Sequence, residues 1–421
     1  MATTDIRQIA IAKSVLGNAE IEAVRKTIAS GWVAQGPRVA AFEADFAEYT
    51  GAAHACAVTN CTTAMHLALL AVGVGPGDIV ATVSHSNIAT ANCIRHCGGE
   101  PVFIDIDPAT YNMAPEALRQ FLAKDCESAG GSTIRYKHMA SLAAANGPPA
   151  KLPEPARGRV AAILVVHQMG RPCELPEIIE IAKAFDLPLV EDAACAIGSE
   201  VRLSPNTEWE RIGRPHGDVA CFSFHPRKVI TTGEGGMLVT NAPAIDQRCR
   251  KLRQHAMSMP ADQRHESQTV CFEEYTETGF NYRMTDIQAA IGIEQLKRLP
   301  DILRKRRALA ASYTERLQAI PWLQAVVPDD FMRPNWQSFP VRLAADAPCT
   351  QLKFMQYLLD RGIATRRGIM NAHQEPAYAG PAWNLPHSEA ARDSVVLLPL
   401  HNYLEEDDTA FVLDTAKKLI E

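Results

Sequence analysis

The chain has 421 residues, 47% of them hydrophobic and 21% charged, with a formal net charge of -6; it is long enough for two or three domains and lacks the basic excess that attracts nucleic acid or anionic membranes. Its eleven cysteines are irregularly spaced without a C-x-x-C pair, which favours reduced thiols over a disulfide framework. The sequence contains neither a secretory leader pattern nor a run of roughly 18 apolar residues, so we expect a cytoplasmic protein with no membrane and no nucleic-acid partner.

The segment from about residue 50 to 245 alternates helical patterns with short apolar runs. The stretch AVTNCTTAMHLALLAVGV (57–74) predicts a strand end, a turn and an amphipathic helix. Five further runs predict buried strands: DIVATVS (78–84), EPVFIDID (100–107), VAAILVVHQMG (160–170), LPLVEDAA (187–194) and DVACFSF (218–224). Continuous apolar strands separated by helices indicate an α/β fold with a mostly parallel sheet covered by helices on both faces.

Two later changes of pattern suggest the domain organisation. Residues 124–158 interrupt the alternation with Gly, Ser, Ala and Pro clusters, which are typical of an insertion. A long helical pattern at about 284–318 precedes the strand-like SFPVRL and the helical TQLKFMQYLLDRG. We therefore expect a large domain over residues 1–283 and a smaller C-terminal α+β domain over residues 284–421.

Ligands of open α/β sheets gather where the parallel strands end. The predicted strands bring four polar positions to this edge of the sheet: Cys61 to Ala64, Ser84 to Asn87, Asp192 and Ser223. We expect these widely separated residues to meet in one crevice.

A lysine stands beside this edge, in CFSFHPRKVITTGEGGMLVTN (221–241). Most such lysines are solvated surface charges. Here Thr231 and Thr232, followed by three glycines, allow a tight turn that would direct the Lys228 amine into the crevice. A lysine amine forms a Schiff base with pyridoxal phosphate (PLP), which also needs an acid at its pyridine nitrogen and a cup for its phosphate.

Candidates for the acid and the cup are present. Asp192 ends the run LPLVEDAAC, where its carboxylate could keep the pyridine nitrogen protonated, although a helix N-cap is an equally good interpretation. Thr62 and Thr63 open the helix of NCTTAMHLAL, whose hydroxyls and free amides suit an anion, although ordinary capping would look the same. Ser223, five residues before Lys228, could add a hydroxyl to the same phosphate.

Seven segments together resemble the DegT/DnrJ/EryC1/StrS family of PLP-dependent aminotransferases, in the same order: SGWVAQGPRVAAFEADFA, NCTTAMHLAL, PVFIDIDPATYN, EDAACAIGS, FSFHPRKVITTGEGGMLVTN, GFNYRMTDIQAAIGIEQL and GIATRRGIMNAHQEPAY. The resemblance covers about nine-tenths of the chain and leaves out the segment 124–158. It implies the fold-type I aminotransferase architecture, a homodimer with each active site at the subunit interface, and keto-sugar substrates that are usually linked to a nucleotide.

The resemblance also implies roles for particular residues. Lys228 would be the Schiff-base lysine and Asp192 the partner of the pyridine nitrogen. The phosphate would be held by Thr62, Thr63 and Ser223, with Asn281 of GFNYRMTD reaching the cofactor of the partner subunit. Some sugar dehydratases of this family carry a histidine in place of the lysine; because Lys228 is retained three residues after His225, transamination is favoured.

The chain departs from the family pattern at two ring contacts. Asn87 occupies the slot where relatives usually stack an aromatic residue on the cofactor, and His85 is a possible substitute. Cys195 stands where many relatives carry Gln or His near the phenolic oxygen, and it is a poorer hydrogen-bonding partner. These changes affect ring clamping and the choice of acceptor.

Four other motifs each have a functional and a structural interpretation. Cys93, His96 and Cys97 in CIRHC lack a second ligand pair, so packing is favoured over a metal site, and we expect no metal. GVGPGD (73–78) precedes a strand rather than following one, which favours a turn over a dinucleotide loop. RKRR (304–307) is predicted to be the solvated face of the long helix. The adjacent arginines Arg366 and Arg367 suit an anionic substrate about as well as surface salt bridges.

The resulting hypothesis is a ping-pong transamination. An amino acid, L-glutamate by family analogy, would give its amino group to the cofactor, and a keto-sugar would then accept it. Lys228 would move the proton as general base and acid. The alternatives are an acceptor of the cyclitol or non-nucleotide keto-sugar acid type, or a non-catalytic protein that binds PLP or sugar and acts as a regulator.

Overall fold

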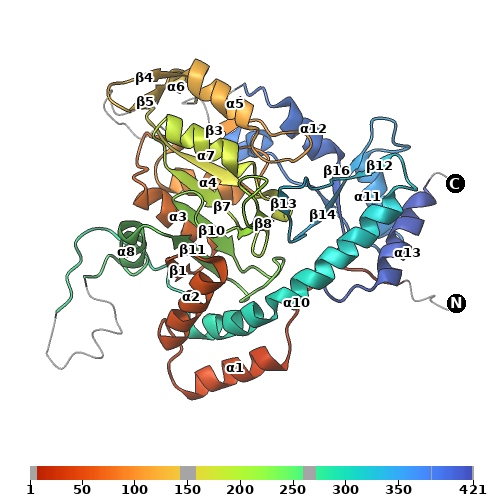
Figure 1. Ribbon diagram of the computed structural model, residues 1–421, viewed down its shortest axis with the longest axis horizontal. Coiled ribbons are helices and arrows are strands. Elements are labelled where there is room, and N and C mark those ends of the chain that lie inside the picture. Colours follow the sequence, from red (N-terminus) through yellow and green to blue (C-terminus); the bar gives the residue numbers. More distant parts are fainter. Residues whose placement is uncertain (1–6, 143–157, 259–271, 381, 420–421) are drawn as a thin grey trace.

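The computed structural model describes residues 7–142, 158–258, 272–380 and 382–419. Its centre is a seven-stranded sheet with the strand order β1-β11-β10-β7-β6-β2-β3 (Figure 1). The strands are β1 (His54–Val58), β2 (Ile79–Val83), β3 (Glu100–Ile104), β6 (Val160–Val166), β7 (Leu189–Asp192), β10 (Val219–Ser223) and β11 (Gly236–Thr240). All five apolar runs that the sequence predicts to be buried strands lie in this sheet, so these predictions are confirmed.

Most of the sheet is parallel. β10, β7, β6, β2 and β3 pair in parallel, as continuous apolar strands buried on both faces should. β11 is antiparallel to both of its neighbours, β1 and β10. The sequence predicts the turn after Lys228 but not that the residues after it return through the sheet in the opposite direction.

Helices cover both faces of the sheet, as predicted. Along β1, Ala55 and Ala57 face one hydrophobic core, while Cys56 and Val58 face another. The first core receives apolar side chains from α2 (Pro37–Thr50), α5 (Pro115–Gln120), α7 (Leu175–Ala184) and the first half of α10 (Asp286–Leu317). The second receives them from α3 (Cys61–Ala71), α4 (Ile88–His96) and α8 (Pro243–Leu252). This arrangement is the predicted α/β architecture of a fold-type I aminotransferase.

The predicted insertion begins as regular structure. A π-helical turn (Phe121–Asp125) leads into the antiparallel strands β4 (Cys126–Ser128) and β5 (Ile134–Tyr136), and the short helix α6 (Met139–Leu142) follows. The rest of the insertion, residues 143–157, lies outside the described residues.

A second sheet occupies the C-terminal part of the chain, with the strand order β12-β14-β16-β15. Its strands are β12 (Leu323–Ala325), β14 (Phe339–Leu343), β15 (Arg366–Arg367) and β16 (Val395–Leu398), and α11 (Gln351–Leu359) and α13 (Glu406–Lys417) pack against it. This is the smaller α+β unit that the sequence predicts. Ile9 packs in the same core and pairs with Ile363, so the N-terminal residues also contact this unit. The division at residues 283 and 284 stays a prediction.

The long helix α10 joins the two units (Figure 1) and begins at a capping box in which Thr285 accepts a hydrogen bond from the Gln288 amide. The prediction that RKRR is a solvated face is wrong for Arg306. This side chain is 6% exposed and donates hydrogen bonds to the carbonyl oxygens of Trp336, Gln337 and Leu400. The helix turns one arginine of the run inward, where loop carbonyls supply the acceptors.

Candidate active site

A cavity of about 1090 Å³ lies at the carboxyl ends of the parallel strands and is closed on its other side by residues of the C-terminal sheet. Seven of the eight predicted site residues line it: Thr62, Thr63, Asn87, Asp192, Cys195, Ser223 and Lys228. Asn281 is exposed and lies outside this cavity, while its neighbour Tyr282 lines it. In the structure, these seven residues therefore lie together at the carboxyl ends of the strands.

The start of α3 forms one wall. Asn60 caps the helix, accepting a hydrogen bond from the Thr63 amide at 2.9 Å, and the Thr63 hydroxyl donates back to the Asn60 carbonyl at 2.8 Å. Both threonines line the cavity, but the Thr63 hydroxyl proton is used by the cap. Gly236 of β11 lies directly behind this turn, where a Cβ atom would be 2.4 Å from the Asn60 carbonyl carbon. Helix amides and the Thr62 hydroxyl at this position suit an anion.

A buried carboxylate forms the second part of the site. Asp192 ends β7 and is 4% exposed. One of its oxygens accepts from the Thr90 hydroxyl at 2.8 Å and the other from the Ala194 amide at 3.1 Å. Thr90 lies 2.8 Å from the Ser86 hydroxyl, and because its own proton goes to Asp192, Ser86 is the donor in that contact. The next helix after Asp192 in the described chain is α8 (Pro243–Leu252), so the interpretation of Asp192 as an N-cap is wrong.

The lysine lies between these two features. After β10, the Lys228 amide donates to the His225 carbonyl at 2.8 Å, and the Thr232 amide returns to the Phe224 carbonyl at 3.0 Å. Gly233 has φ of +85°, a conformation that favours glycine. This is the predicted tight turn, and it directs the lysine into the cavity.

The lysine amine contacts a sulfur atom. Lys228 Nζ lies 3.1 Å from Cys195 Sγ, so the residue that the resemblance places near the phenolic oxygen of the cofactor is adjacent to the lysine amine. Burial disfavours the ammonium form, but the Cys195 sulfur and the Asp192 carboxylate favour it more strongly and raise the pKa of Lys228.

The two candidates for the ring contact lie in different places. Asn87 lines the cavity, but its side-chain oxygen caps α4 by accepting from the Ala89 amide at 3.0 Å. The suggestion that His85 replaces the stacked aromatic residue is wrong, because His85 is fully buried outside the cavity lining. Its Nδ1 contacts the side chain of Asn371 instead.

Charged groups line the mouth of the cavity. Arg366 and Arg367 of β15 both face it, as does Arg227. Across the described chain, no ion pair joins any of these three guanidinium groups to a carboxylate. The salt-bridge interpretation of Arg366 and Arg367 is therefore disfavoured relative to binding of an anion.

An aromatic group that the sequence did not mark lies near the α3 wall. His66, His96 and Tyr282 all line the cavity, and His66 Nδ1 is 3.2 Å from the Tyr282 hydroxyl. Burial and the neighbouring His96 ring lower the pKa of His66 to about 4, so this ring is neutral.

The two thiols of CIRHC donate to carbonyl oxygens of α4, and no cluster of metal-ligand side chains occurs in the part of the chain that the structure describes. The helices in this part include none that is long and apolar enough to cross a membrane.

Comparison with known proteins gives consistent matches. Residues 15–417 match the model of the DegT/DnrJ/EryC1/StrS aminotransferase family. The chain is 31% identical over 412 residues to the spore coat polysaccharide biosynthesis protein SpsC of Bacillus subtilis, covering 96% of this chain and 95% of that protein.

Two solved structures add to this picture. The aminotransferase TlmJ from Streptoalloteichus hindustanus is 32% identical, with a TM-score of 0.81 and 98% of each chain covered. The structure of DesI in the presence of its TDP-sugar product is 26% identical, with a TM-score of 0.78, and covers 98% of this chain and 92% of that one. The chain therefore belongs to the DegT/DnrJ/EryC1/StrS aminotransferase family, as its motifs predicted.

Proposed function

We propose that this aminotransferase uses PLP to transfer an amino group from L-glutamate to a keto-sugar linked to a nucleotide. The observation that carries the proposal is the convergence of Lys228, Asp192 and the start of α3 on one cavity. SpsC is named for polysaccharide biosynthesis, and DesI has a TDP-sugar product, so relatives of this chain handle sugars.

The donor set fits PLP. The Lys228 amine suits the aldehyde, the Asp192 carboxylate suits the pyridine nitrogen, and the amides of α3 with Thr62 and Ser223 suit the phosphate. When bound, PLP supplies an electron-withdrawing ring that stabilises negative charge at the α-carbon of the amino donor.

The chain's own residues then have distinct tasks. Lys228 Nζ takes the proton from the α-carbon of the donor and later returns a proton, acting as general base and then as general acid. Asp192, fixed by Thr90 and the Ala194 amide, holds a proton on the ring nitrogen. Arg227, Arg366 and Arg367 offer paired N–H donors to the phosphates of a nucleotide or to the carboxylate of the donor.

We further propose a cytoplasmic homodimer in which Asn281 completes the partner's cofactor site. Asn281 is exposed and separate from the cavity of its own chain. Several large apolar side chains near the N-terminus are also exposed, as expected of a surface that another subunit covers: Leu16, Ile21, Ile28, Trp32 and Val33. An Asn281→Ala variant that remains dimeric by light scattering but binds PLP as tightly as the wild type would contradict this role.

The test of the reaction begins with the visible absorption of the protein mixed with PLP, followed by L-glutamate. We expect a visible band that glutamate converts to a near-ultraviolet band, and no such band in Lys228→Ala. The converted enzyme is then given a TDP-linked keto-sugar, the same sugar without its nucleotide, and a keto-cyclitol. Return of the visible band with the last two alone would favour the alternative acceptors, and no band with excess PLP would contradict the role of Lys228.

A further inference from the structure

Two segments that both line the cavity are joined to each other by the residues next to them. Ser86 and Asn87, which follow β2, line the cavity, and so do residues 365–370 of the C-terminal part of the chain. His85 immediately precedes the first segment and Asn371 immediately follows the second. The two residues form an antiparallel backbone bridge, and the Ala372 amide donates to the Ser84 carbonyl at 2.9 Å.

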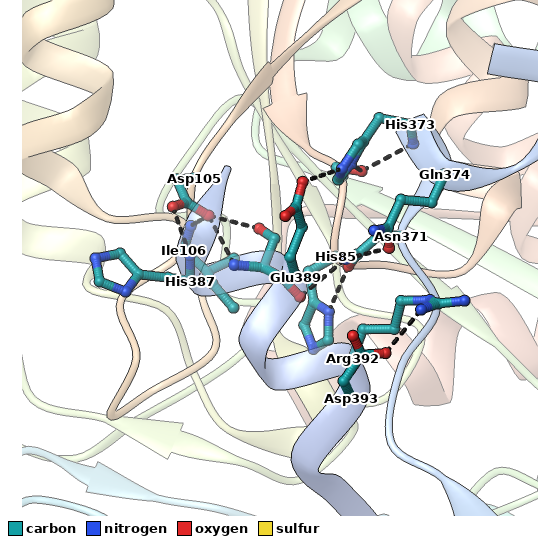
Figure 2. A network of polar contacts seen from close by, with 12 residues as sticks. His85, Asp105, Ile106, Asn371, His373, Gln374, His387, Glu389, Arg392 and Asp393 are labelled. Carbon is teal, nitrogen blue, oxygen red and sulfur yellow. Dashed lines mark hydrogen bonds and ion pairs between the residues drawn. The ribbon is translucent and has the colours of Figure 1, made fainter. Parts of the chain in front are cut away.

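The side chains of this pair also contact each other (Figure 2). His85 Nδ1 lies 2.8 Å from Asn371 Oδ1, and both residues are 0% exposed. The Asn371 amide nitrogen donates to the Ser388 carbonyl at 2.9 Å and to the Gln374 side chain at 3.0 Å. A carbonyl oxygen can only accept, so the orientation of the Asn371 amide is fixed and its oxygen faces His85.

This orientation defines the state of the histidine. His85 Nδ1 must carry the proton that it donates to Asn371, and its Nε2 is then bare and has no hydrogen-bonding partner in the described chain. Burial lowers the pKa of His85 to about 4, so the ring stays neutral near neutral pH. Leaving the buried Nε2 without a hydrogen-bonding partner costs free energy. That this cost is tolerated indicates that the position requires the hydrogen bond that Nδ1 donates to Asn371.

Asn371 belongs to a segment that is anchored to the large sheet. We name residues 371–380 and 382–394 the clasp; it contains α12 (Pro386–Ser394). Asp105, after β3, caps α12 by accepting from the His387 amide at 3.0 Å and from the Ser388 amide at 2.9 Å (Figure 2). The residue at the helix's own N-cap, Leu385, supplies no side-chain cap.

Further contacts hold the clasp against α4 and β2. Tyr378 donates to the Asn92 side chain at 2.8 Å, and Arg95 donates to the Ala377 carbonyl at 2.8 Å. The Ser84 hydroxyl accepts from the His373 amide at 3.0 Å and lies 2.6 Å from His373 Nδ1. These contacts attach the clasp to α4 and to the residues that follow β2.

We propose that His85 and Asn371 are positioning residues that set the separation between the Ser86–Asn87 wall and the 365–370 wall of the active site, and hence the fit of the substrates. This proposal rests on the proposed function of the cavity. Neither side chain lines the cavity, so the pair acts through its neighbours in the chain. The residues proposed to hold PLP, on α3, β7 and β10, are on other elements than this pair.

The test uses isosteres of the two ring nitrogens. His85→Asn keeps a donor near Nδ1, His85→Gln places its amide near Nε2, and His85→Leu has neither. We expect His85→Gln and His85→Leu to raise the KM for the amino donor, taken as the most active L-amino acid with the wild type, by about ten-fold or more. We expect the Kd for PLP to change less than about three-fold, and His85→Asn to restore the KM.

Arg392→Gln is the matched control, because it removes an ion pair with Asp393 on the same helix (Figure 2) without touching the pair. Its KM should equal that of the wild type. Equal KM values for the wild type, His85→Leu and His85→Gln would overturn the proposal, as would a parallel loss of PLP affinity in both variants. A wild type that binds no PLP and shows no turnover would contradict the proposed function instead.

Hydrogen exchange tests whether the pair couples the two walls, and the result does not depend on which amino donor the enzyme uses. In His85→Leu and His85→Gln, amides of residues 84–92 and 365–374 should exchange faster, while those of α10 keep the wild-type rate. His85→Asn should match the wild type in both segments. Unchanged exchange at 365–370 in the two disrupting variants would show that the walls are not held by this pair and would overturn the proposal.

Discussion

Lys228 Nζ donates a hydrogen bond to Cys195 Sγ across 3.1 Å, so the amine that we propose to react with PLP contacts a thiol. The sulfur contributes to the raised pKa of the amine, together with Asp192. An amine must lose its proton before it can attack an aldehyde. Given the proposed role of Lys228, we expect the residue at position 195 to affect how readily the protein captures PLP.

Cys195→Ala should accelerate this capture. Removing the sulfur lowers the pKa of Lys228, because one of the groups that raises it is gone, and a larger fraction of the amine is then neutral between pH 7 and 9. The rate at which the visible band forms after PLP is mixed with the cofactor-free protein should increase and reach its plateau at lower pH. Cys349→Ala, a half-buried cysteine outside the cavity, is the control. Slower capture in Cys195→Ala would contradict this account.

Thr90→Val should impair catalysis more than folding. The variant keeps the side-chain volume but removes the hydroxyl that donates to Asp192 at 2.8 Å, leaving the carboxylate oxygen without that partner. Hydrogen bonds to charged groups contribute about 1.5 to 3 kcal/mol, so kcat should fall about ten-fold to a hundred-fold. Thr90→Ser, which retains the hydroxyl, should recover most of the activity. The comparison requires kcat and Tm for both variants, and equal kcat values would reject the assignment.

Gly236→Ala should damage the anion site. Its Cβ would lie 2.4 Å from the Asn60 carbonyl carbon, so β11 and the start of α3 must separate. Overpacking of this kind costs about 1 to 3 kcal/mol, and displacement of the α3 amides should also weaken PLP binding. Gly75→Ala is the matched control, because its Cβ meets only the Asp78 side chain, at 3.9 Å. Urea unfolding and PLP titration measure both effects; if both variants bind PLP equally, the close approach has no role in the site.

Glu43→Gln should lower the free energy of unfolding at neutral pH. It should also make that free energy less dependent on pH in the acid range. Burial alone would raise the pKa of Glu43, but Arg253 and Arg250 outweigh burial and hold that pKa below its usual value. A lowered pKa gives stability that is present above the ordinary range of a glutamate and is lost as the pH falls through the folded-state value.

Neutralising Glu43 leaves the buried Arg253 guanidinium without its carboxylate, while Arg250 keeps its ion pair with Asp246, and the loss should cost about 3 to 5 kcal/mol of unfolding free energy at pH 7. The difference in unfolding free energy between wild type and variant, measured by urea unfolding, should decrease toward pH 3. Glu22→Gln, which breaks an exposed pair with Arg25, should be nearly neutral. A constant gap from pH 7 to pH 3 would contradict the role of the ionised carboxylate.

The sequence predicts the strands well because each is a continuous apolar run, and buried parallel strands require such runs. The meeting of Thr62, Asp192, Ser223 and Lys228 follows from the same reasoning, since parallel strands end at one edge. Strand order and direction are not encoded in local periodicity. The position of β11, which pairs antiparallel with the preceding strand β10 and with the distant strand β1, is therefore not predicted.

The missed or misjudged side chains share a cause. Arg306 and His85 are stabilised by carbonyl or amide groups that lie 30 to 286 residues away in the chain. Thr90, on α4, contacts Asp192 at the end of β7, 102 residues away. Local composition carries no record of such partners. A polar residue at a buried helical or strand-end position is the one signal that could have marked them, and it does not identify the partner.

The helix α10 passes through two hydrophobic cores without interruption. Ile293 and Leu299 pack beneath the large sheet, while Leu309 and Tyr313 pack in the C-terminal core. Unfolding of either core leaves that half of the 32-residue helix without its packing partners, so the continuous helix couples the stability of one core to that of the other. The two cores should therefore melt as a single cooperative unit, and calorimetry of the intact chain should give one transition instead of two.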